Sequence, residues 1–411
     1  MHIPMSYVAY RLCAGLLLCA LCATSTARAA KEAFLPTDQI ERGMRGYGLS
    51  VFQGVEIDTF GVEILGVMRN AIGPGHDLIL ARMFGADLEH TGIIRGMSGS
   101  PVYLENRLIG AVAYGWTYSK DPIGGIMPIG PMIDVAQRKR AAESPETTRQ
   151  SVDFSPADWS GDARLPQQAT LEQLATPVAL TGFSGSASSV LEQALAPFGM
   201  GAVTGIGDRA ADDTDVPMSA GAGLGVQLIN GDRSATAVGT LTWTDGKRFV
   251  GFGHPLMHIG ATEMPATSVY VHQIIPSQIN SFKLGSAVRP VGSVYEDRQA
   301  GIGGRIGPAP TMLPVTVDIA SESSAERSKY SVIRHRDLTP VLVRSVLLSA
   351  METAEKLSGD AALNLRASIA LRDGRRVEYE QFYSGPSAAL IASVEAVQPM
   401  VAIAQSPFTG I

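Results

Sequence analysis

Short runs of β-forming residues, separated by Gly, Asn and Pro, recur along most of this chain and restrict it to folds built from many short strands. Glycine supplies 44 of the 411 residues, about 11% against roughly 7% in an average protein. Glycine disfavours helix interiors and permits tight turns. Hydrophobic residues make up 45% and charged residues 18%, which excludes a largely disordered chain. We therefore predict a mainly β protein whose length allows two or three domains.

Two regions carry most of this strand pattern, and we expect a β domain from each: residues 31–140 and residues 216–307. In the second region, Asp245-Gly246 separates two apolar runs and predicts a hairpin. The runs of the first region are Gly48–Phe52, Val62–Val67, Leu78–Arg82, Val102–Leu104 and Leu108–Tyr114.

The other two regions differ in composition. Arg138–Gln168 is polar and Pro/Ser-rich, and we expect residues 141–215 to form a linker with one short helix over Ser189–Ala196. Residues 308–411 predict a C-terminal α+β domain, with a helix that starts at Thr339-Pro340 and a hairpin at Asp373-Gly374. The last residues, Ser406–Ile411, carry no sequence signal that ends a helix or strand, which is compatible with a truncated domain.

Residues 1–30 have the pattern of a secretory signal peptide. Arg11 precedes the apolar run Leu12–Ala23, and Ala27-Arg28-Ala29 resembles a cleavage site. All three cysteines lie in this segment, so its removal leaves no disulfide, thiol nucleophile or cysteine metal site. We expect an exported protein, periplasmic or secreted, with no membrane span after signal removal. An uncleaved anchor is the alternative.

Composition and spacing exclude several ligand classes. A net charge of −6 provides no basic field for nucleic acid. Gly301–Gly307 lacks the spacing of a nucleotide-binding loop, and Asp208–Asp215 lacks that of a calcium loop. His254 and His258 are four residues apart, but Pro255 argues against the helix that a zinc-binding pair requires. We expect no cofactor and no metal, and the sequence leaves the oligomeric state open.

The first stretch that suggests catalysis is Gly96-Met97-Ser98-Gly99-Ser100-Pro101. A serine in a glycine turn suits a nucleophile, because glycine lets a substrate approach closely and successive N–H groups can converge on one oxyanion. Ser98 is the candidate nucleophile. A purely structural Gly/Ser turn is the alternative.

The second stretch is Val250–Pro255, where His254 follows a hydrophobic strand and lies in a glycine turn. This placement suits a general base that takes the proton of a serine. A lone histidine is more often a surface or core residue, so the hypothesis depends on contact with Ser98. Hydrogen-bond range between the two side chains favours catalysis, and more than about 8 Å counts against it.

The serine turn and the strands after it resemble chymotrypsin-like serine proteases, which carry a Gly-Asp-Ser-Gly-Gly-Pro turn, a hairpin and a strand that ends near Ser-Trp-Gly. Here a hairpin at 105–107 leads to Ala113-Tyr114-Gly115. The resemblance implies two six-stranded half-barrels, with the N–H groups of Gly96 and Ser98 as the oxyanion hole and residues 113–115 as the peptide-binding wall. Ser100 falls where those enzymes usually have glycine, so it is the weaker nucleophile candidate.

The same resemblance bounds the specificity. Gly92 lies six residues before the serine, at the position of the base of the primary pocket, and Met127-Pro128-Ile129 is a candidate second wall. Because no carboxylate lies at Gly92, the resemblance implies a neutral, apolar or small residue before the cut.

The two stretches together resemble the SpoIVB-type serine peptidases. That family carries Thr-Gly-Gly-Ile-Val-x-Gly-Met-Ser-Gly-Ser-Pro and then Ile-Gly-Ala-Val. Residues 91–101 here are Thr-Gly-Ile-Ile-Arg-Gly-Met-Ser-Gly-Ser-Pro, and residues 109–112 are Ile-Gly-Ala-Val. The family's Gly-Thr-x-Thr strand and Gly-x-Leu-Gly-His turn match Gly239–Trp243 and Gly251–His254.

Three departures from that family affect the site. The serine half precedes the histidine half, which implies a circular permutation, and no PDZ-like segment is found. The family's aspartate position falls near Phe84. We therefore consider Asp297 as the third catalytic residue, with Asp77 or Asp87 as alternatives. A dyad of Ser98 and His254, oriented by a backbone carbonyl, is a further option.

These features favour an exported serine endopeptidase that acts through an acyl-enzyme on a limited set of protein or peptide substrates. The alternative is an inactive barrel that serves as a periplasmic binding or scaffold protein. The missing family aspartate supports that alternative.

Overall fold

The computed structural model describes residues 33–116, 119–138, 171–204, 215–321, 325–354 and 361–405. The expected signal peptide, most of the expected linker, most of the acidic loop before Asp215 and the last six residues of the chain lie outside the described residues.

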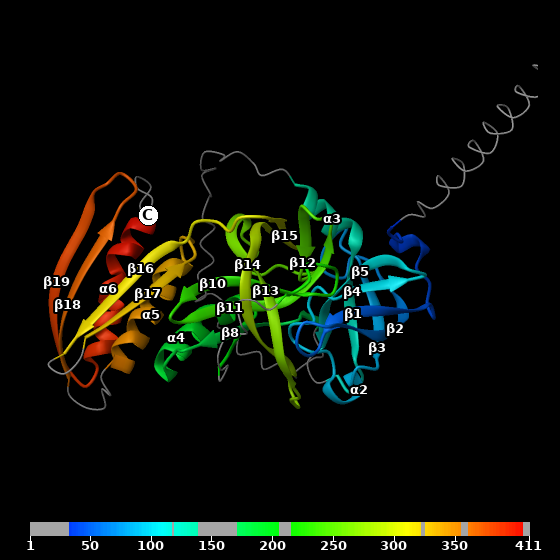
Figure 1. Cartoon of the computed structure of the whole chain (residues 1–411). Helices are drawn as coiled ribbons and strands as arrows, with labels where there is room; N and C mark the ends of the chain where they lie inside the picture. Colours follow the sequence, from blue (N-terminus) through cyan, green and yellow to red (C-terminus); the bar gives the residue numbers. More distant parts are fainter. Residues whose placement is uncertain are drawn as a thin grey trace, which may run out of the picture.

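The N-terminal part forms a closed six-stranded antiparallel barrel (Figure 1). The strand order is β4-β1-β2-β3-β6-β5, and β4 also pairs with β5, which closes the ring. The large side chains of Phe60, Ile64 and Met83 are fully buried in its core. The strands are β1 (Arg45–Val51), β2 (Ile57–Met68), β3 (Leu78–Phe84), β4 (Pro101–Leu104), β5 (Arg107–Trp116) and β6 (Ile123–Pro128), and the short helices η1 (Thr37–Gln39) and α2 (Leu88–Thr91) accompany them.

A second, larger sheet contains another ring of six strands. Its order is β10-β13-β14-β15-β12-β11, and β10 pairs with β11 to close it. Strands β8 and β9 extend the sheet beyond β11, and β17 and β16 extend it beyond β10. The strands are β8 (Thr176–Thr181), β9 (Met200–Val203), β10 (Gly223–Gly231), β11 (Ser234–Thr244), β12 (Arg248–Gly251), β13 (Gly260–Ile275), β14 (Phe282–Arg298), β15 (Gly301–Ile306), β16 (Leu313–Ala320) and β17 (Ala325–Val332).

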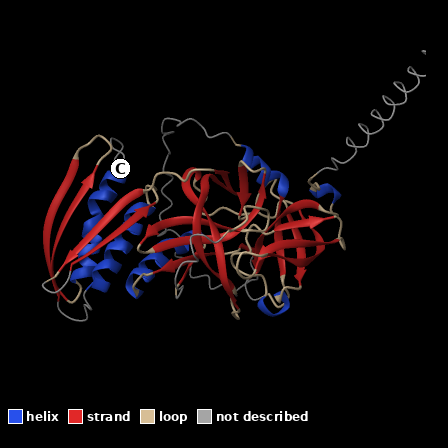
Figure 2. Cartoon of the chain, in the orientation of Figure 1, coloured by secondary structure: helices blue, strands red, loops and turns tan. Residues whose placement is uncertain are grey.

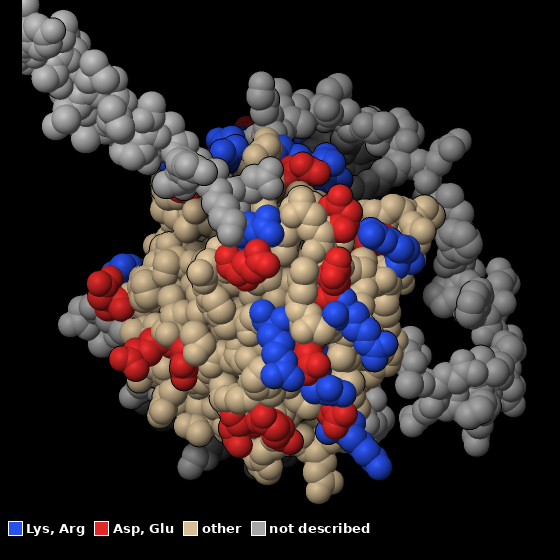
Figure 3. Space-filling view, turned by 90° about the vertical axis from the view of Figure 1, so that its right-hand side faces the viewer, with Lys and Arg blue, Asp and Glu red and all other residues tan. Residues whose placement is uncertain are grey.

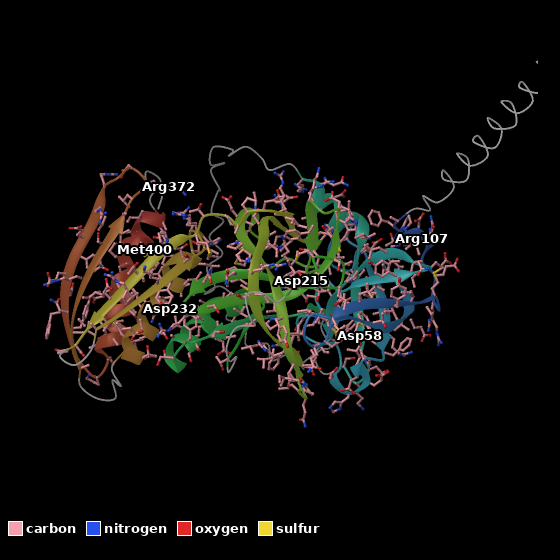
Figure 4. The ribbon with its side chains drawn as sticks, viewed as in Figure 1. Asp58, Arg107, Asp215, Asp232, Arg372 and Met400 are labelled. Carbon is pink, nitrogen blue, oxygen red and sulfur yellow. The ribbon has the colours of Figure 1, made fainter. Side chains whose placement is uncertain are left out.

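In the C-terminal part, α6 (Ala388–Gln405) packs against the hairpin of β18 (Ala361–Ala370) and β19 (Arg376–Gly385). Helix α5 (Leu338–Ala354) packs against α6 and against β16 and β17 of the second sheet. Met400, labelled in Figure 4, is buried on α6 in the same apolar cluster as Leu342 of α5 and Val332 of β17. The helices therefore share their core with the second sheet.

The two barrels pack directly against each other. Ala113 of β5 and Val250 of β12 belong to one buried apolar cluster. Helix α3 (Ile129–Gln137) follows the first barrel and lies on the second, where the Tyr295 hydroxyl donates to the carbonyl of Ala136 at 2.7 Å. Glycine turns from both barrels meet at this interface.

The predicted mainly β fold, with two six-stranded rings and a C-terminal helix and hairpin, is confirmed (Figure 2). The alternation in β18 is also present, because every second residue from Ala361 is half-buried and the others are exposed. The region expected to be a linker also supplies β8, β9, α4 (Gly185–Leu195), η3 (Ala196–Phe198) and the short strand β7 (Leu171–Gln173). Its apolar run Val178–Leu180 is buried because it pairs with β11.

Helix α6 is the one helix in the described ranges that is long and apolar enough to cross a membrane, with a mean hydropathy of 1.4. The sequence analysis expected no such span after the signal. The helix contains Pro399 and packs on α5 and β18, and 33% of its apolar window is buried inside the structure.

Charges of both signs are mixed on the end of the molecule that the first barrel forms (Figure 3). Arg45 lies 3.6 Å from Glu63, and Arg107, labelled in Figure 4, lies 3.3 Å from Glu105. Exposed pairs of this kind contribute about 0–1 kcal/mol each. This face carries no continuous basic patch.

Candidate active site

The turn before β4 requires glycine at two positions. Gly96 and Gly99 have φ angles of 95° and 93°, in the region that side chains rarely adopt. A Cβ on Gly99 would lie 2.1 Å from the carbonyl oxygen of Thr240, so no larger residue can be placed there without moving the backbone. The glycines thus allow the Ser98 turn of the first barrel to lie directly against β11 of the second.

Strand β11 holds this turn by three hydrogen bonds. The N–H of Thr240 donates to the Ser98 carbonyl at 2.8 Å, and its hydroxyl donates to the Gly96 carbonyl at 2.9 Å. The Thr242 hydroxyl donates to the Gly99 carbonyl at 2.7 Å. The position of Ser98 therefore depends on both barrels, although the serine belongs to the first.

A bend after β12 brings His254 next to the Ser98 turn. Phe252 and Gly253 have φ angles of 68° and 69°. A Cβ on Gly253 would lie 3.0 Å from the Cβ of Ala113, so this bend also packs closely on β5. The result is a distance of 2.9 Å between His254 Nε2 and Ser98 Oγ, within hydrogen-bond range.

The imidazole is oriented by a backbone carbonyl. Nδ1 of His254 lies 2.8 Å from the Pro255 oxygen. For Nε2 to accept the Ser98 proton, Nδ1 must carry hydrogen and donate it to that oxygen. Complete burial lowers the pKa of His254 to about 4, although the Pro255 carbonyl opposes the shift. The histidine is therefore neutral at pH 7, as a general base must be.

Asp297 was expected to orient the His254 imidazole, but it binds the backbone of the loop that follows His254 instead. Its two carboxylate oxygens accept hydrogen bonds from the N–H groups of Leu256 and Met257, each at 2.8 Å, and of Ile259 at 3.3 Å. The imidazole meets the Pro255 carbonyl instead. Burial raises the pKa of Asp297, and these backbone donors oppose that shift. Asp297 thus fixes the loop after His254 rather than the ring itself.

The two alternative acids lie elsewhere. Asp77 pairs with Arg69 and accepts the N–H of Asn70 at 2.9 Å, and this backbone bond is the main cause of its lowered pKa. Asp87 precedes α2 with a φ angle of 62°. Neither residue has a contact with His254 in the described part of the chain. Of the options drawn from the sequence, the geometry matches a dyad oriented by a carbonyl.

The expected oxyanion donors are open. For the N–H groups of Gly96 and Ser98, no acceptor lies within hydrogen-bond distance among the described residues. The neighbouring N–H groups of Met97 and Gly99 are bonded to Ile94 and Val112. Two free donors on one turn, beside a serine, are the arrangement that stabilises a tetrahedral oxyanion.

The expected substrate-binding residues fall into two sets. Gly92 and Gly115 line a common cavity of about 210 Å³. Ala113 is buried and its carbonyl accepts a hydrogen bond from Leu174, while the Tyr114 hydroxyl reaches Gln299 of the second barrel at 3.2 Å. Residues 127–129, the proposed second wall, are buried and are not among the residues that line this cavity.

The sequence analysis missed a fully buried lysine beside the serine turn. Nζ of Lys283 donates to the Ser50 hydroxyl at 2.8 Å and approaches the Thr240 hydroxyl at 3.4 Å. The Ser100 hydroxyl donates to Ser50 at 2.9 Å, so Ser100 belongs to this network and not to the histidine. A position for a Cβ on Gly96 lies 3.1–3.2 Å from the lysine stem. A single lysine in a strand carries no sequence signal for such a role.

Lys283 makes the stability of the protein depend on pH. Burial lowers its pKa to about 7 from an ordinary 10.5. Between these values the unfolded chain binds a proton that the folded chain does not, so the free energy of unfolding falls as the pH decreases from 10.5 toward 7, by up to about 1.4 kcal/mol per pH unit. We expect Lys283→Met to remove this slope, as measured by urea unfolding between pH 7.5 and 9.5. Exposed Lys247→Met should keep it, and an unchanged slope in Lys283→Met would refute this account.

Candidate metal sites are lacking in the part of the chain that the structure describes, because no three His, Cys, Asp or Glu residues cluster there. His258 is exposed, and His272 bonds to the Ser286 hydroxyl at 2.9 Å.

Comparison with known proteins concerns the serine-bearing barrel alone. No curated protein and no solved structure matches the chain. Residues 25–127 match the family described as SpoIVB peptidase S55, and the matched segment contains Ser98 but ends before the histidine-bearing barrel. The resemblance drawn from the sequence of the serine turn is thereby confirmed, while the permuted order and the missing PDZ-like segment stay predictions. The match assigns residues 25–127 to the SpoIVB-type peptidases and indicates that the protein is a serine peptidase, a hydrolase.

Proposed function

We propose that the protein is a serine endopeptidase in which Ser98 is the nucleophile, His254 the general base and the Pro255 carbonyl the group that orients the imidazole. The 2.9 Å contact between Ser98 Oγ and His254 Nε2 carries this proposal, because the two residues lie 156 positions apart and come from different barrels. A structural serine turn does not require a neutral, buried histidine at its hydroxyl.

The proposed reaction has two balanced steps. Ser98 Oγ attacks the substrate carbonyl carbon while its proton passes to His254 Nε2, and the N–H groups of Gly96 and Ser98 hold the oxyanion. The C–N bond breaks as the leaving amine takes the proton from His254. Water then attacks the acyl-enzyme with the same histidine as base, which releases a carboxylic acid and restores Ser98.

Asp297 supports this dyad as a positioning residue. Its carboxylate binds three N–H groups of the loop that follows His254. Those bonds fix the path of residues 255–259, and with it the Pro255 carbonyl that meets the imidazole.

We also propose that the enzyme is exported and acts on a limited set of protein substrates. Arg11 with the apolar run Leu12–Ala23 supports export. The serine-first order of the two barrels supports a circular permutation relative to the SpoIVB-type peptidases, since a catalytic set is defined in space and not by its order in the chain.

Hydrolysis of a fluorogenic peptide with leucine before the scissile bond tests the proposed function. We expect the purified chain to release the fluorophore and Ser98→Ala to lose this activity. Equal hydrolysis by Ser98→Ala would overturn the assignment of the nucleophile. A folded wild type that binds peptides without hydrolysing them would favour the inactive binding barrel, which the burial of Ser98 and His254 also suits.

A further inference from the structure

Strand β7 lies on the wall of β5 that the sequence analysis assigned to a bound peptide. The antiparallel pairing joins Leu171–Gln173 to Tyr114–Trp116. The next N–H in the chain, that of Leu174, donates to the carbonyl of Ala113 at 2.9 Å. An extended peptide that adds to a sheet edge makes the same kind of backbone contacts. The chain's own backbone therefore fills this wall.

The segment and the serine turn bind to successive residues along the same edge of β5. The carbonyl of Val112 accepts the N–H of Gly99 at 2.8 Å, and the carbonyl of the next residue, Ala113, accepts the N–H of Leu174. Leu174 is thus the residue of the segment that follows the turn of Ser98 directly. If residues 113–115 form the peptide-binding wall, as the resemblance to chymotrypsin-like proteases implies, a substrate cut by Ser98 would place the residue before its scissile bond at this position.

The side chain of Leu174 enters the expected specificity pocket. It is 9% exposed and shares a buried apolar cluster with Ile94 and Met97. It also lines the same cavity as Gly92 and Gly115, and a Cβ on Gly115 would lie 3.1 Å from its Cδ2 atom. An apolar side chain at this place agrees with the neutral primary pocket that the sequence predicts.

Opposite charges lie on the cavity two residues earlier in the segment. Glu172 exerts a Coulomb attraction on the guanidinium of Arg95, whose pKa is lowered mainly by burial and raised by this carboxylate. Both residues line the cavity. Arg95 adjoins Gly96, so a cation of the serine turn faces the acidic residue of the segment.

The segment leaves the candidate oxyanion donors unoccupied. The Leu174 carbonyl has no hydrogen bond among the described residues, and the N–H groups of Gly96 and Ser98 stay unoccupied. Two residues later the chain enters β8, where the N–H of Thr176 donates to the carbonyl of Gly199 at 3.0 Å. The Leu174 carbonyl is therefore not bonded to the candidate oxyanion donors, and the residues after it are bonded to the second sheet.

The exposure of the site agrees with a blocked groove. Ser98 and His254 are both 0% exposed, although a protein substrate must reach the hydroxyl of Ser98. Some part of the surroundings therefore has to move before a protein substrate can reach Ser98.

We propose that Leu171–Ala175 is a built-in peptide inhibitor that occupies the substrate groove of Ser98. The groove accordingly takes an extended peptide with an apolar residue, as at Leu174, before the scissile bond and an acidic residue, as at Glu172, two positions earlier. Arg95 is the specificity-determining residue for that acid. This inference rests on the proposed function, because it names the substrate class of the same site.

The test is the rate at which a fluorophosphonate probe modifies the purified full chain. If the segment fills the groove in about 90% of molecules, the competent fraction is about 10%, and vacating the groove raises the apparent rate about tenfold. We expect Leu174→Asp to label about tenfold faster than the wild type, and Leu174→Ala to show a smaller increase. Lys247→Ala should match the wild type, because this exposed side chain lies outside both the segment and the serine turn. Circular dichroism verifies that each variant is folded.

Peptide competition tests the ligand class. We expect acetyl-Leu-Glu-Gln-Leu-amide to slow the labelling of Leu174→Asp. The same peptide with lysine in place of glutamate should slow the labelling less, and the peptide with aspartate in place of the last leucine should have no effect. If both Leu174 variants label Ser98 at the wild-type rate, the inhibitor proposal is wrong and the proposed function stands. If no folded variant labels, the proposed function fails and the inference fails with it.

Discussion

His254→Ala is expected to lower the rate of Ser98 acylation by roughly 10⁴- to 10⁶-fold, the loss that removal of a base from a serine–histidine unit causes. Nε2 of His254, at 2.9 Å, is the proposed base, and without the imidazole no other described residue forms a hydrogen bond with the Ser98 hydroxyl. The measurement is single-turnover acylation with an activated ester, so that binding and product release do not obscure the chemical step.

His272→Ala is the matched control for this prediction. His272 is also on the second barrel and bonds to a serine hydroxyl, that of Ser286 at 2.9 Å, but it lies outside the serine turn. We expect its acylation rate to stay near the wild-type value. A loss of less than about tenfold in His254→Ala would show that another group takes the proton.

Asp297→Ala should have the largest effect on stability. The substitution leaves the buried N–H groups of Leu256 and Met257, and the half-buried one of Ile259, without their acceptor. Each unsatisfied buried donor costs about 1–3 kcal/mol before relaxation. We expect the free energy of unfolding to fall by about 3–5 kcal/mol in urea titrations at pH 7, with acylation of Ser98 also reduced because the path of the loop changes.

Asp245→Ala is the control that separates the loss of a buried carboxylate acceptor from the loss of an exposed one. The Asp245 carboxylate also binds two backbone N–H groups, those of Lys247 and Arg248, but on a partly exposed hairpin where water can replace it. We expect its stability to change by about 0.5 kcal/mol or less. Equal losses in the two variants would contradict the role given to the burial of Asp297.

The barrels and the two main site residues could be predicted because their signals are local. Alternating apolar residues and glycine turns mark the strands around Ser98, and a glycine bend after a hydrophobic strand marks His254. The residue types at both places are those that the chemistry requires. Whether the two side chains meet depends on the packing of Gly99 on Thr240 and of Gly253 on Ala113, which no local pattern reports.

The remaining parts of the site depend on contacts between distant residues. The role of Asp297 follows from the register of β13 and β14, which places it opposite Gly260 and beside the loop after His254. Lys283 on a strand has the pattern of a solvent-exposed residue, yet it is fully buried against Ser50. Strand β7 has only three residues, and the edge of β5 supplies its partner.

The central claim is that Ser98 is an activated nucleophile, and the most direct test maps a covalent fluorophosphonate adduct by mass spectrometry. The Leu174→Asp chain is used beside the wild type so that a filled groove does not hide the serine. We predict one adduct, on Ser98, which is absent in Ser98→Ala and still present in Ser100→Ala. An adduct on Ser100, or no adduct on any folded form, would contradict the account.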